Sequence, residues 1–313
     1  MAAMPSLRQL RYLVEVGEKL NFRAAAETCF VTQSTLSSGI KELETQLGVE
    51  LVERDPRGVR LTAAGEGVAQ RAKVMLAAAQ DLVETAKGAG APLSGSFRLG
   101  VIPTVAPFLL PVALPELRET YPQLKLYLRE DLTERLVEKL RNGDLDATLI
   151  ALPFDTGELT ALPLFKDEFW FVAREDDPHA KKKEVLVREL EPGSVLLLEE
   201  GHCLRDHAIA ACGARGPKSQ SMVEATSLNT LIQMVEGGLG VTLLPEITLK
   251  AGILNGTRLV ARPFATNVPS RTIALMTRPS GSRRGDVDLL AKFFQDHARK
   301  AGRTKVPSRS RGR

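Results

Sequence analysis

The sequence predicts an N-terminal domain made of helices, joined to a larger domain of alternating strands and helices. Four stretches with helical spacing of apolar residues fill the chain up to residue 88, whereas strand and helix patterns alternate from residue 97 to residue 298. Gly88–Ser96, between the two parts, has the glycine-, alanine- and serine-rich composition of a linker. With 313 residues, of which 43% are hydrophobic, the chain is long enough for two or three domains with sizeable cores.

Polar residues mark where each predicted N-terminal helix begins, because a side-chain oxygen at that position can accept from the first free N–H groups of the helix. Gly48 marks the end of the third helix. Between the third and fourth helices, residues 51–61 hold two short strand patterns around Asp55-Pro56-Arg57-Gly58, which predicts a hairpin, or wing. The four capping residues are Ser6, Asn21, Thr32 and Thr62.

The larger domain alternates strands with helices, which indicates α/β layers with mostly parallel sheets. About 200 residues is large for one open sheet, so we expect two lobes. The predicted strands are 97–102, 125–130, 147–151, 169–174, 195–198, 241–244 and 271–276. The predicted helices are 107–121, 133–142, 227–236 and 287–298.

Composition excludes several classes of protein. The first twelve residues lack the apolar run of a signal peptide, and prolines at 107, 111 and 115 interrupt the longest apolar stretches, so we expect no membrane span. Three cysteines are too few for a disulfide framework, and a cytoplasmic protein is expected. Removing the seven cationic side chains of Arg299–Arg313 from the net charge of +4 leaves −3. We expect that segment to be a basic, disordered tail.

Residues 22–41 have the pattern of a helix-turn-helix, a motif that places its second helix in the major groove of DNA. Ala25 and Ala26 allow close helix packing, and the second helix opens with hydroxyl and amide side chains. A small helical domain with a solvated polar face is the alternative. The predicted DNA contacts are Gln33, Ser34, Thr35, Ser37, Ser38 and Lys41 of the helix, with Arg57 and Arg60 of the wing.

The segment 199–212 concentrates the rare reactive side chains, with two of the three cysteines and two of the four histidines. Cys203 is predicted at the start of a helix, where the helix dipole favours a thiolate, and His202 and Arg205 could add to this. Asp206 either orients Arg205 through an ion pair or occupies the favourable first turn. An inert core thiol is the commoner state of a lone cysteine, but these polar neighbours argue against it.

The nine-residue spacing from Cys203 to Cys212 constrains their chemistry. In a helix the two thiols are separated by ~13.5 Å and point to roughly opposite faces. A disulfide needs Cα atoms within ~7 Å, so bond formation requires that the helix unwinds. A zinc site formed by His202, Cys203, His207 and Cys212 matches no common spacing, and a Cys–His hydrolase lacks an acyl-binding motif. We expect neither a metal nor a cofactor.

These motifs resemble the LysR-type transcriptional regulators. Residues 7–66, including Leu61-Thr62-Ala63-Ala64-Gly65, resemble the winged helix-turn-helix of that family, and the likeness extends to about residue 298. The resemblance implies a periplasmic-binding-protein-like effector domain of two lobes, a linker-helix dimer, double-stranded promoter DNA and RNA polymerase as partners, and no enzymatic activity. The implied parts are the winged helix-turn-helix at 1–62, the linker helix and hinge at 63–96, lobe I at 97–165 plus 271–298, lobe II at 166–270 and the tail at 299–313.

Gly201–Asp206 together with Cys212 is similar to the peroxide-sensing element of the OxyR branch of this family. The resemblance implies that hydrogen peroxide oxidises Cys203 to a sulfenic acid, and that Cys212 resolves it to an intramolecular disulfide. It further implies a homotetramer, built as a dimer of dimers, that a thiol reductant resets. The expected role is therefore redox regulation of transcription in the oxidative stress response.

The same resemblance supplies a peroxide pocket. It implies that two threonine hydroxyls hold peroxide beside the thiol, and that nearby polar side chains support the thiolate. Arg271 is the expected arginine of this site, with Arg278 as its competitor. The full predicted pocket is Thr104, Thr133, His202, Arg205, Asp206 and Arg271.

Two other functions remain open. A regulator with the same fold could respond to a small carboxylate or aromatic effector between the lobes, with the thiols incidental. A thiol peroxidase with a vestigial DNA-binding end is the second alternative. His207 adds a titratable group that could change the pH dependence of switching, and Cys29, on an apolar face, is interpreted as structural.

Overall fold

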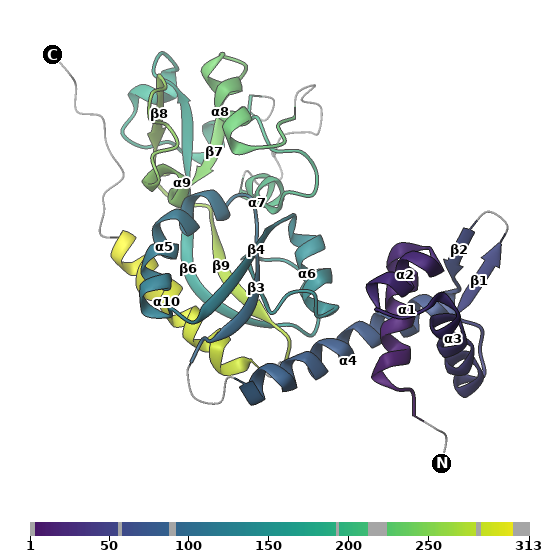
Figure 1. Cartoon of the computed structure of the whole chain (residues 1–313). Coiled ribbons are helices and arrows are strands. Elements are labelled where there is room, and N and C mark those ends of the chain that lie inside the picture. The colour runs from purple at the N-terminus through teal and green to yellow at the C-terminus, as the bar shows by residue number, and fades with distance from the viewer. Residues whose placement is uncertain are drawn as a thin grey trace. The chain divides into compact units, whose positions relative to one another are not determined.

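The computed structural model describes residues 4–55, 58–87, 92–191, 194–211, 224–279 and 283–302. The chain forms two compact units, one made mainly of residues 1–90 and the other mainly of residues 91–313 (Figure 1). None of the helices within the described ranges combines the length and the hydropathy needed to cross a membrane.

The described part of the N-terminal unit consists of helices and one hairpin, as predicted. Ser6 Oγ accepts from the N–H of Gln9, and the Gln9 side chain accepts from the Ser6 N–H, which completes a capping box. Asn21, Thr32 and Thr62 also accept from backbone N–H groups at the starts of their helices. The elements are α1 (Leu7–Lys19), α2 (Phe22–Thr28), α3 (Gln33–Leu47), β1 (Val52–Asp55), β2 (Gly58–Leu61) and α4 (Ala63–Lys87).

Helix α3 is held by its apolar face. Leu36, Ile40 and Leu43 are fully buried in a core shared with α1 and α2. Gly39 lies against the ring of Tyr12, where an added Cβ would come within 2.8 Å of the ring. Because this face is fixed at helical spacing, the opposite, polar face of α3 is turned to the surface.

The second unit is built on strands that share the long strand β6 (Thr160–Arg174). The first half of β6 pairs with β9, and its second half pairs with β7 and β8. Strand order is β4-β3-β5-β9-β6-β7, with β8 also against β6 (Figure 1). The other strands are β3 (Gly95–Val101), β4 (Leu124–Glu130), β5 (Ala147–Leu152), β7 (Thr242–Pro245), β8 (Leu259–Arg262) and β9 (Ser270–Thr277).

The prediction of mostly parallel sheets is wrong. Among the described strands of this unit, only the β3–β4 and β3–β5 ladders are parallel, and the ladders that involve β6 or β9 are antiparallel. Consecutive strands joined by crossover helices run parallel, as β3, β4 and β5 do. Strands β6 and β9 instead pair antiparallel. They are far apart in the sequence, so no local sequence pattern indicates that they pair.

Two strand predictions also need correction. The predicted strand 169–174 is only the second half of β6, because Pro163 and a register shift between Pro163 and Phe165 interrupt the apolar pattern of the first half. The predicted strand 195–198 makes only isolated bridges, from Val195 to Val241 and from Leu198 to Ala225.

The helices of this unit follow the predicted positions closely. The short helix α9 and strand β8 were not predicted. Helix α10 extends to Gly302, so residues 299–302, which we expected in the basic tail, form its last turn, and Lys300 Nζ donates to Glu116 at 2.5 Å. Residues 303–313 lie outside the described ranges. The helices are α5 (Ala106–Thr120), α6 (Thr133–Arg141), α7 (Cys203–Ala211), α8 (Leu228–Glu236), α9 (Glu246–Lys250) and α10 (Arg284–Gly302).

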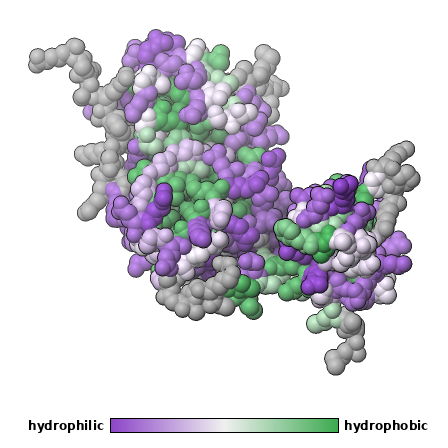
Figure 2. Space-filling view, in the orientation of Figure 1, coloured by the Kyte–Doolittle hydropathy of each residue, from purple (hydrophilic) through white to green (hydrophobic). Residues whose placement is uncertain are grey.

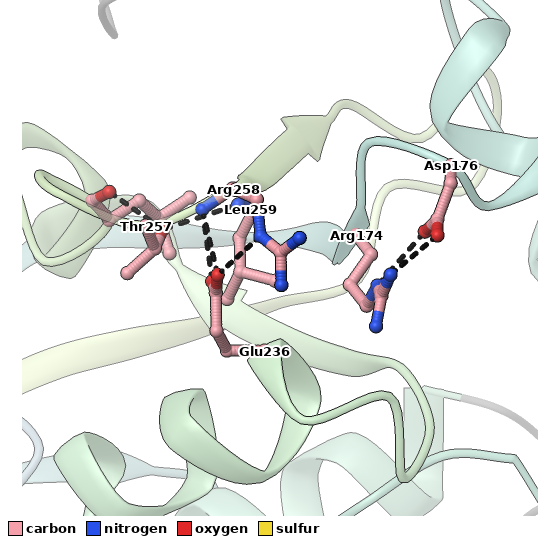
Figure 3. Close-up of polar contacts among 7 residues, drawn as sticks. Arg174, Asp176, Glu236, Thr257, Arg258 and Leu259 are labelled. Carbon is pink, nitrogen blue, oxygen red and sulfur yellow. Dashed lines mark hydrogen bonds and ion pairs between the residues drawn. The ribbon is translucent and has the colours of Figure 1, made fainter.

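Polar contacts join the end of α8 to the start of β8 (Figure 3). Glu236, the last residue of α8, accepts from the backbone N–H of Arg258 at 3.0 Å and from its Nε at 3.2 Å. Arg174, at the end of β6, donates to Asp176 at 2.6 Å. These pairs are partly exposed, so each adds at most a small amount to stability.

Figure 2 shows apolar surface gathered over this unit between hydrophilic stretches.

Candidate functional site

The predicted DNA contacts lie on the surface of α3 and β2. Ser37 is half-buried, Arg60 is exposed on β2, and Arg57 lies outside the described residues. A groove of about 800 Å³ runs beside α3 and is also lined by Arg8 and Gln9 of α1, which sequence reasoning missed. The exposed predicted contacts of α3 are Gln33, Ser34, Thr35, Ser38 and Lys41.

Cys203 is the first residue of α7 and its side chain is buried, with 6% of the residue exposed. It is a free thiol at the end of the helix where backbone N–H groups point outward, which is the positive end of the helix dipole. Gly201, with a φ of 92°, makes the preceding turn. A Cβ at Gly201 would lie 3.1 Å from Leu132 Cδ1, so this turn packs directly beside the start of α6.

Thr133 begins α6 at that point. The residue is 2% exposed, and its Oγ1 is buried without a hydrogen-bond partner among the described residues. Buried hydroxyls nearly always have a partner, because desolvating one without compensation is costly. A buried hydroxyl left unpaired among the described residues, next in sequence to Leu132 at the turn before Cys203, is a feature that points to a small polar ligand.

Arg271 lies on β9, a strand that contacts α7, and it joins several elements. Its Nε donates to Asp167 Oδ2 at 3.0 Å, and its Nη1 donates to Thr104 Oγ1 at 2.8 Å. Asp167 also accepts from the N–H of Ile247 at 3.0 Å. Burial raises the pKa of Asp167, and Arg271 opposes that rise. Arg278 follows the far end of β9, ~23 Å away along an extended strand, so Arg271 is the arginine that contacts Thr104.

Of the two roles considered for Asp206, the ion pair with Arg205 is not the one that the structure shows. Arg205 Nη1 donates to Glu224 at 2.7 Å and to the carbonyl of Leu198 at 3.0 Å. Asp206 is exposed in the first turn of α7, which is the other role considered for it. Neighbours in a helical sequence point about 100° apart, so the ion partner comes from a distant segment. Arg205 thus anchors α7 through Glu224 and Leu198.

The two histidines of the segment are both buried. Burial lowers the pKa of His202, although Glu199 and a hydrogen bond to the Thr226 backbone oppose this. Burial also lowers the pKa of His207, with Arg271 acting in the same direction. The neutral imidazole is therefore favoured at both positions near neutral pH, and the electrostatic support of the thiolate expected from His202 is not provided by a charged ring.

Cys212, the predicted resolving cysteine, lies outside the described residues, directly after the last residue of α7. Within the described ranges, no group of three His, Cys, Asp or Glu side chains could hold a metal ion. Sequence reasoning missed Asp167, Glu224 and the carbonyl of Pro153, which accepts from His207 Nε2 at 3.1 Å. The only available signal was the charged run Lys166-Asp167-Glu168, which interrupts the apolar residues of this strand.

The chain matches two family descriptions and several known proteins. Residues 7–66 match the "Bacterial regulatory helix-turn-helix protein, lysR family", and residues 90–299 match the "LysR substrate binding domain". The HTH-type transcriptional regulator EstR of Acinetobacter baylyi is 46% identical over 94% of this chain and 98% of its own length.

Two solved structures are also similar. A full-length OxyR from Pseudomonas aeruginosa, with one cysteine replaced by aspartate, is 38% identical with a TM-score of 0.78, covering 94% of this chain and 95% of that one. A cysteine-to-serine variant of Corynebacterium glutamicum OxyR with hydrogen peroxide bound is 35% identical with a TM-score of 0.66, covering 96% of this chain and 95% of that one.

Proposed function

The chain belongs to the LysR family of transcriptional regulators, and we propose that within this family it senses hydrogen peroxide through Cys203 and changes its contacts with promoter DNA. The family consists of DNA-binding regulators and not of enzymes. The likeness to two OxyR structures over nearly the whole chain supports peroxide as the signal.

The observation that carries the proposal is the presence of two buried hydroxyls: Thr133 follows Leu132, which lies against the turn before Cys203, and Thr104 is bonded to Arg271 of β9, the strand that α7 contacts. Thr104 Oγ1 accepts from Arg271, so its own hydrogen is left to donate to a ligand. Thr133 Oγ1 is buried and unpaired among the described residues. Hydrogen peroxide carries a donor and acceptors on each oxygen, so it can satisfy both hydroxyls at once.

The proposed chemistry has two steps. The Cys203 thiolate attacks one peroxide oxygen, so an S–O bond forms, the O–O bond breaks, and the leaving hydroxide takes up a proton to become water. The Cys212 thiolate then attacks the sulfenic sulfur, so the S–S bond forms, the S–O bond breaks, and the leaving hydroxide takes up a proton to become a second water. The second step requires unwinding of α7, because the two ends of an intact helix of this length are too far apart.

Unwinding α7 would break the contacts that hold it. These include the Arg205 bonds to Glu224 and Leu198, and the burial of Leu204 and Ala208. Helix α7 contacts β9, which pairs with β5 and β6. Unwinding α7 would therefore also change the surroundings of these strands. This is the route by which oxidation would alter the assembly.

We further propose a homotetramer, arranged as a dimer of dimers, that acts on RNA polymerase and is reset by a thiol reductant. Exposed apolar side chains on α4, including Met75 and Leu82, support pairing through that helix. A separate groove of about 550 Å³, lined by residues of α5, α9 and α10, supports a second interface on the regulatory unit.

One observation favours a second function. EstR is more similar to this chain than either OxyR structure is, at 46% identity against 38% and 35%. The alternative is a regulator with the same fold that responds to a small organic effector between the two lobes, with the thiols incidental. In that case the oxidation state of Cys203 would not change DNA contacts.

Footprinting on DNA selected for binding to the reduced protein tests the proposal. Peroxide alone should change the protected region, and Cys203→Ser should abolish that change. Cys212→Ser should retain sulfenic acid formation but lose the disulfide and the altered footprint. An unchanged footprint after complete oxidation of the wild-type thiols would overturn the proposal and favour the organic effector.

A further inference from the structure

His207 is a buried side chain that the proposed peroxide chemistry does not use. It lies one helical turn after Cys203, at the i+4 position, and therefore on the same face of α7. Its Nε2 lies 3.1 Å from the carbonyl oxygen of Pro153, in the loop that follows β5. Its Nδ1 is buried and has no partner among the described residues, and the residue is only 8% exposed.

We propose that His207 is a positioning residue that latches α7, and with it Cys203, to the loop after β5 in the reduced protein, and that a proton on its free nitrogen releases this latch. The inference rests on the proposed disulfide switch of α7, and it adds acidity as a second input to that switch. The contact is a tie from α7 to the β5 side of the sheet, whereas Arg205 ties the same helix to Leu198 and Glu224.

The hydrogen-bond chemistry fixes the ring form in the latched state. A carbonyl can only accept, so Nε2 must carry the hydrogen, and the neutral ring has its lone pair on Nδ1. Adding a proton to Nδ1 would create a buried N–H without an acceptor among the described residues. Such an unpaired, charged donor is strongly disfavoured, so the protonated ring would leave the site rather than remain in it.

The charged groups around His207 reinforce this. Arg271, on β9, opposes protonation of His207, and its own carboxylate partner is Asp167 on β6. Asp206, the acid next to it on α7, favours protonation but is exposed. On the loop of Pro153, Asp155 accepts from the N–H of Gly157.

The turn before α7 adds one further group that can titrate. His202 is buried there, directly before Cys203, and it lies in the segment that moves when α7 opens. The variants must therefore be chosen so that the titration of His202 is distinguished from that of His207.

The sign of the pH dependence follows from the direction of the pKa shift. Burial, with Arg271, lowers the pKa of His207 in the folded helix, whereas the hydrogen bond to Pro153 and the charge of Asp206 oppose this. In the unwound segment the ring is in water, where the pKa is about 6.5. Between these two values the open form binds one more proton than the latched form. Acidification below about pH 6.5 therefore favours opening of α7, and the latch is fully effective above it.

The proton balance of the redox couple gives a direct test. Reducing a disulfide to two thiols takes up two protons with two electrons. When α7 refolds on reduction below about pH 6.5, His207 releases its proton, so the net uptake falls toward one. We would measure the midpoint potential of the Cys203–Cys212 couple in full-length protein from pH 5.5 to 8, in wild type and in His207→Gln.

The glutamine variant is the matched control. Its amide N–H can still donate to the Pro153 carbonyl, but the side chain does not titrate. We expect wild type to take up about one proton fewer than His207→Gln at the acid end, and equal numbers above pH 7. Because His202 is present in both proteins, its contribution cancels in the difference. Equal proton numbers at every pH would overturn the inference.

A second measurement does not depend on the redox proposal. Hydrogen exchange of the α7 amides in reduced protein, corrected for intrinsic rates, reports opening of the helix. His207→Leu should raise opening about fivefold at pH 7.5, the effect of losing one hydrogen bond. Wild type should approach that value on acidification, and His207→Gln should not.

The two tests separate the possible failures. If peroxide never yields the disulfide, the proposed function fails, while the exchange data still decide whether the latch exists. If the disulfide forms but α7 opens equally in all three proteins, the latch is wrong and the peroxide switch stands.

Discussion

Cys29 and Cys203 carry the same side chain but lie at opposite ends of their respective helices, α2 and α7. Cys29 is the C-cap of α2, where carbonyl groups point outward, and Cys203 is the first residue of α7, where N–H groups do. Cys29 is the more exposed of the two, yet burial and the nearby Glu15 raise its pKa. The exposed fraction alone is thus a poor guide to thiol chemistry, because neighbouring charges such as Glu15 also act on the thiol.

The two thiols also differ in the groups that surround them. Cys29 packs against the apolar core of the N-terminal unit. The turn before Cys203 lies against Leu132, the neighbour of Thr133, whose buried hydroxyl is unpaired among the described residues. Helix α7 itself contacts β9, the strand whose Arg271 donates to Thr104. One thiol serves packing, while the other lies among groups that can bind a small polar molecule.

The largest expected contrast is in the reaction with peroxide. Cys203→Ser should abolish the loss of two hydrogen atoms seen by mass spectrometry after a peroxide pulse, because the attacking sulfur is gone. Cys29→Ser should leave that mass change and its rate as in wild type. Loss of the mass change in Cys29→Ser would reverse the assignment of roles to the two thiols.

Ion pairs near the two thiols should differ in their contribution to stability. Asp167→Asn leaves the buried Arg271 without its counter-ion and should lower the unfolding free energy by about 3–5 kcal/mol. Glu27→Gln, two residues from Cys29, removes an exposed pair with Arg23 and should cost at most about 0.5 kcal/mol. Urea denaturation, followed separately for each unit, measures both. Similar losses for the two variants would show that burial of the Asp167 pair does not matter.

Thr133→Val tests whether the unpaired hydroxyl serves peroxide. Removing it should slow oxidation of Cys203 about tenfold, the effect of about one lost hydrogen bond to the transition state, while stability holds or rises. Thr148, on β5, has an equally buried hydroxyl that is also unpaired in the described part of the chain, which makes Thr148→Val the matched control. That variant should gain similar stability with an unchanged oxidation rate. Equal slowing in both variants would argue against a specific pocket at Thr133.

The smallest expected effect concerns the pH dependence of Cys29. Because its pKa is raised in the folded protein, less thiolate is present at any given pH below that value. Iodoacetamide labelling of Cys29 from pH 7 to 10 should therefore have its midpoint above that of the same cysteine in urea. A midpoint at or below the value in urea would show that burial and Glu15 do not raise the pKa of Cys29.

The two regions also differ in how much of their structure the sequence reveals. The helix-turn-helix is predictable because Ser6, Asn21, Thr32 and Thr62 carry local capping signals, each within three residues of the N–H group it binds. The start of α7 at Cys203 was predictable for a similar reason, from the turn at Gly201 and the helical composition after it.

The partners of the site were not predictable in this way. Asp167 and Arg271 are 104 residues apart and meet only because β6 and β9 pair. Glu224 lies 19 residues from Arg205, whereas the adjacent Asp206 was the simpler partner to predict from the sequence. Hydrogen bonds between distant strands leave no periodic pattern in the chain, so only the folded arrangement identifies them.

Strand β6 has a consequence for how this chain can change in length. It carries Asp167 to Arg271 in one sheet and buries Phe169 and Phe171 in the next, all on a single extended segment. Inserting one residue after Phe165 would turn every later side chain to the opposite face, which would expose both aromatic rings and draw the carboxylate away from its arginine. Insertions and deletions should therefore accumulate in the surrounding loops, while the number of residues in β6 stays constant.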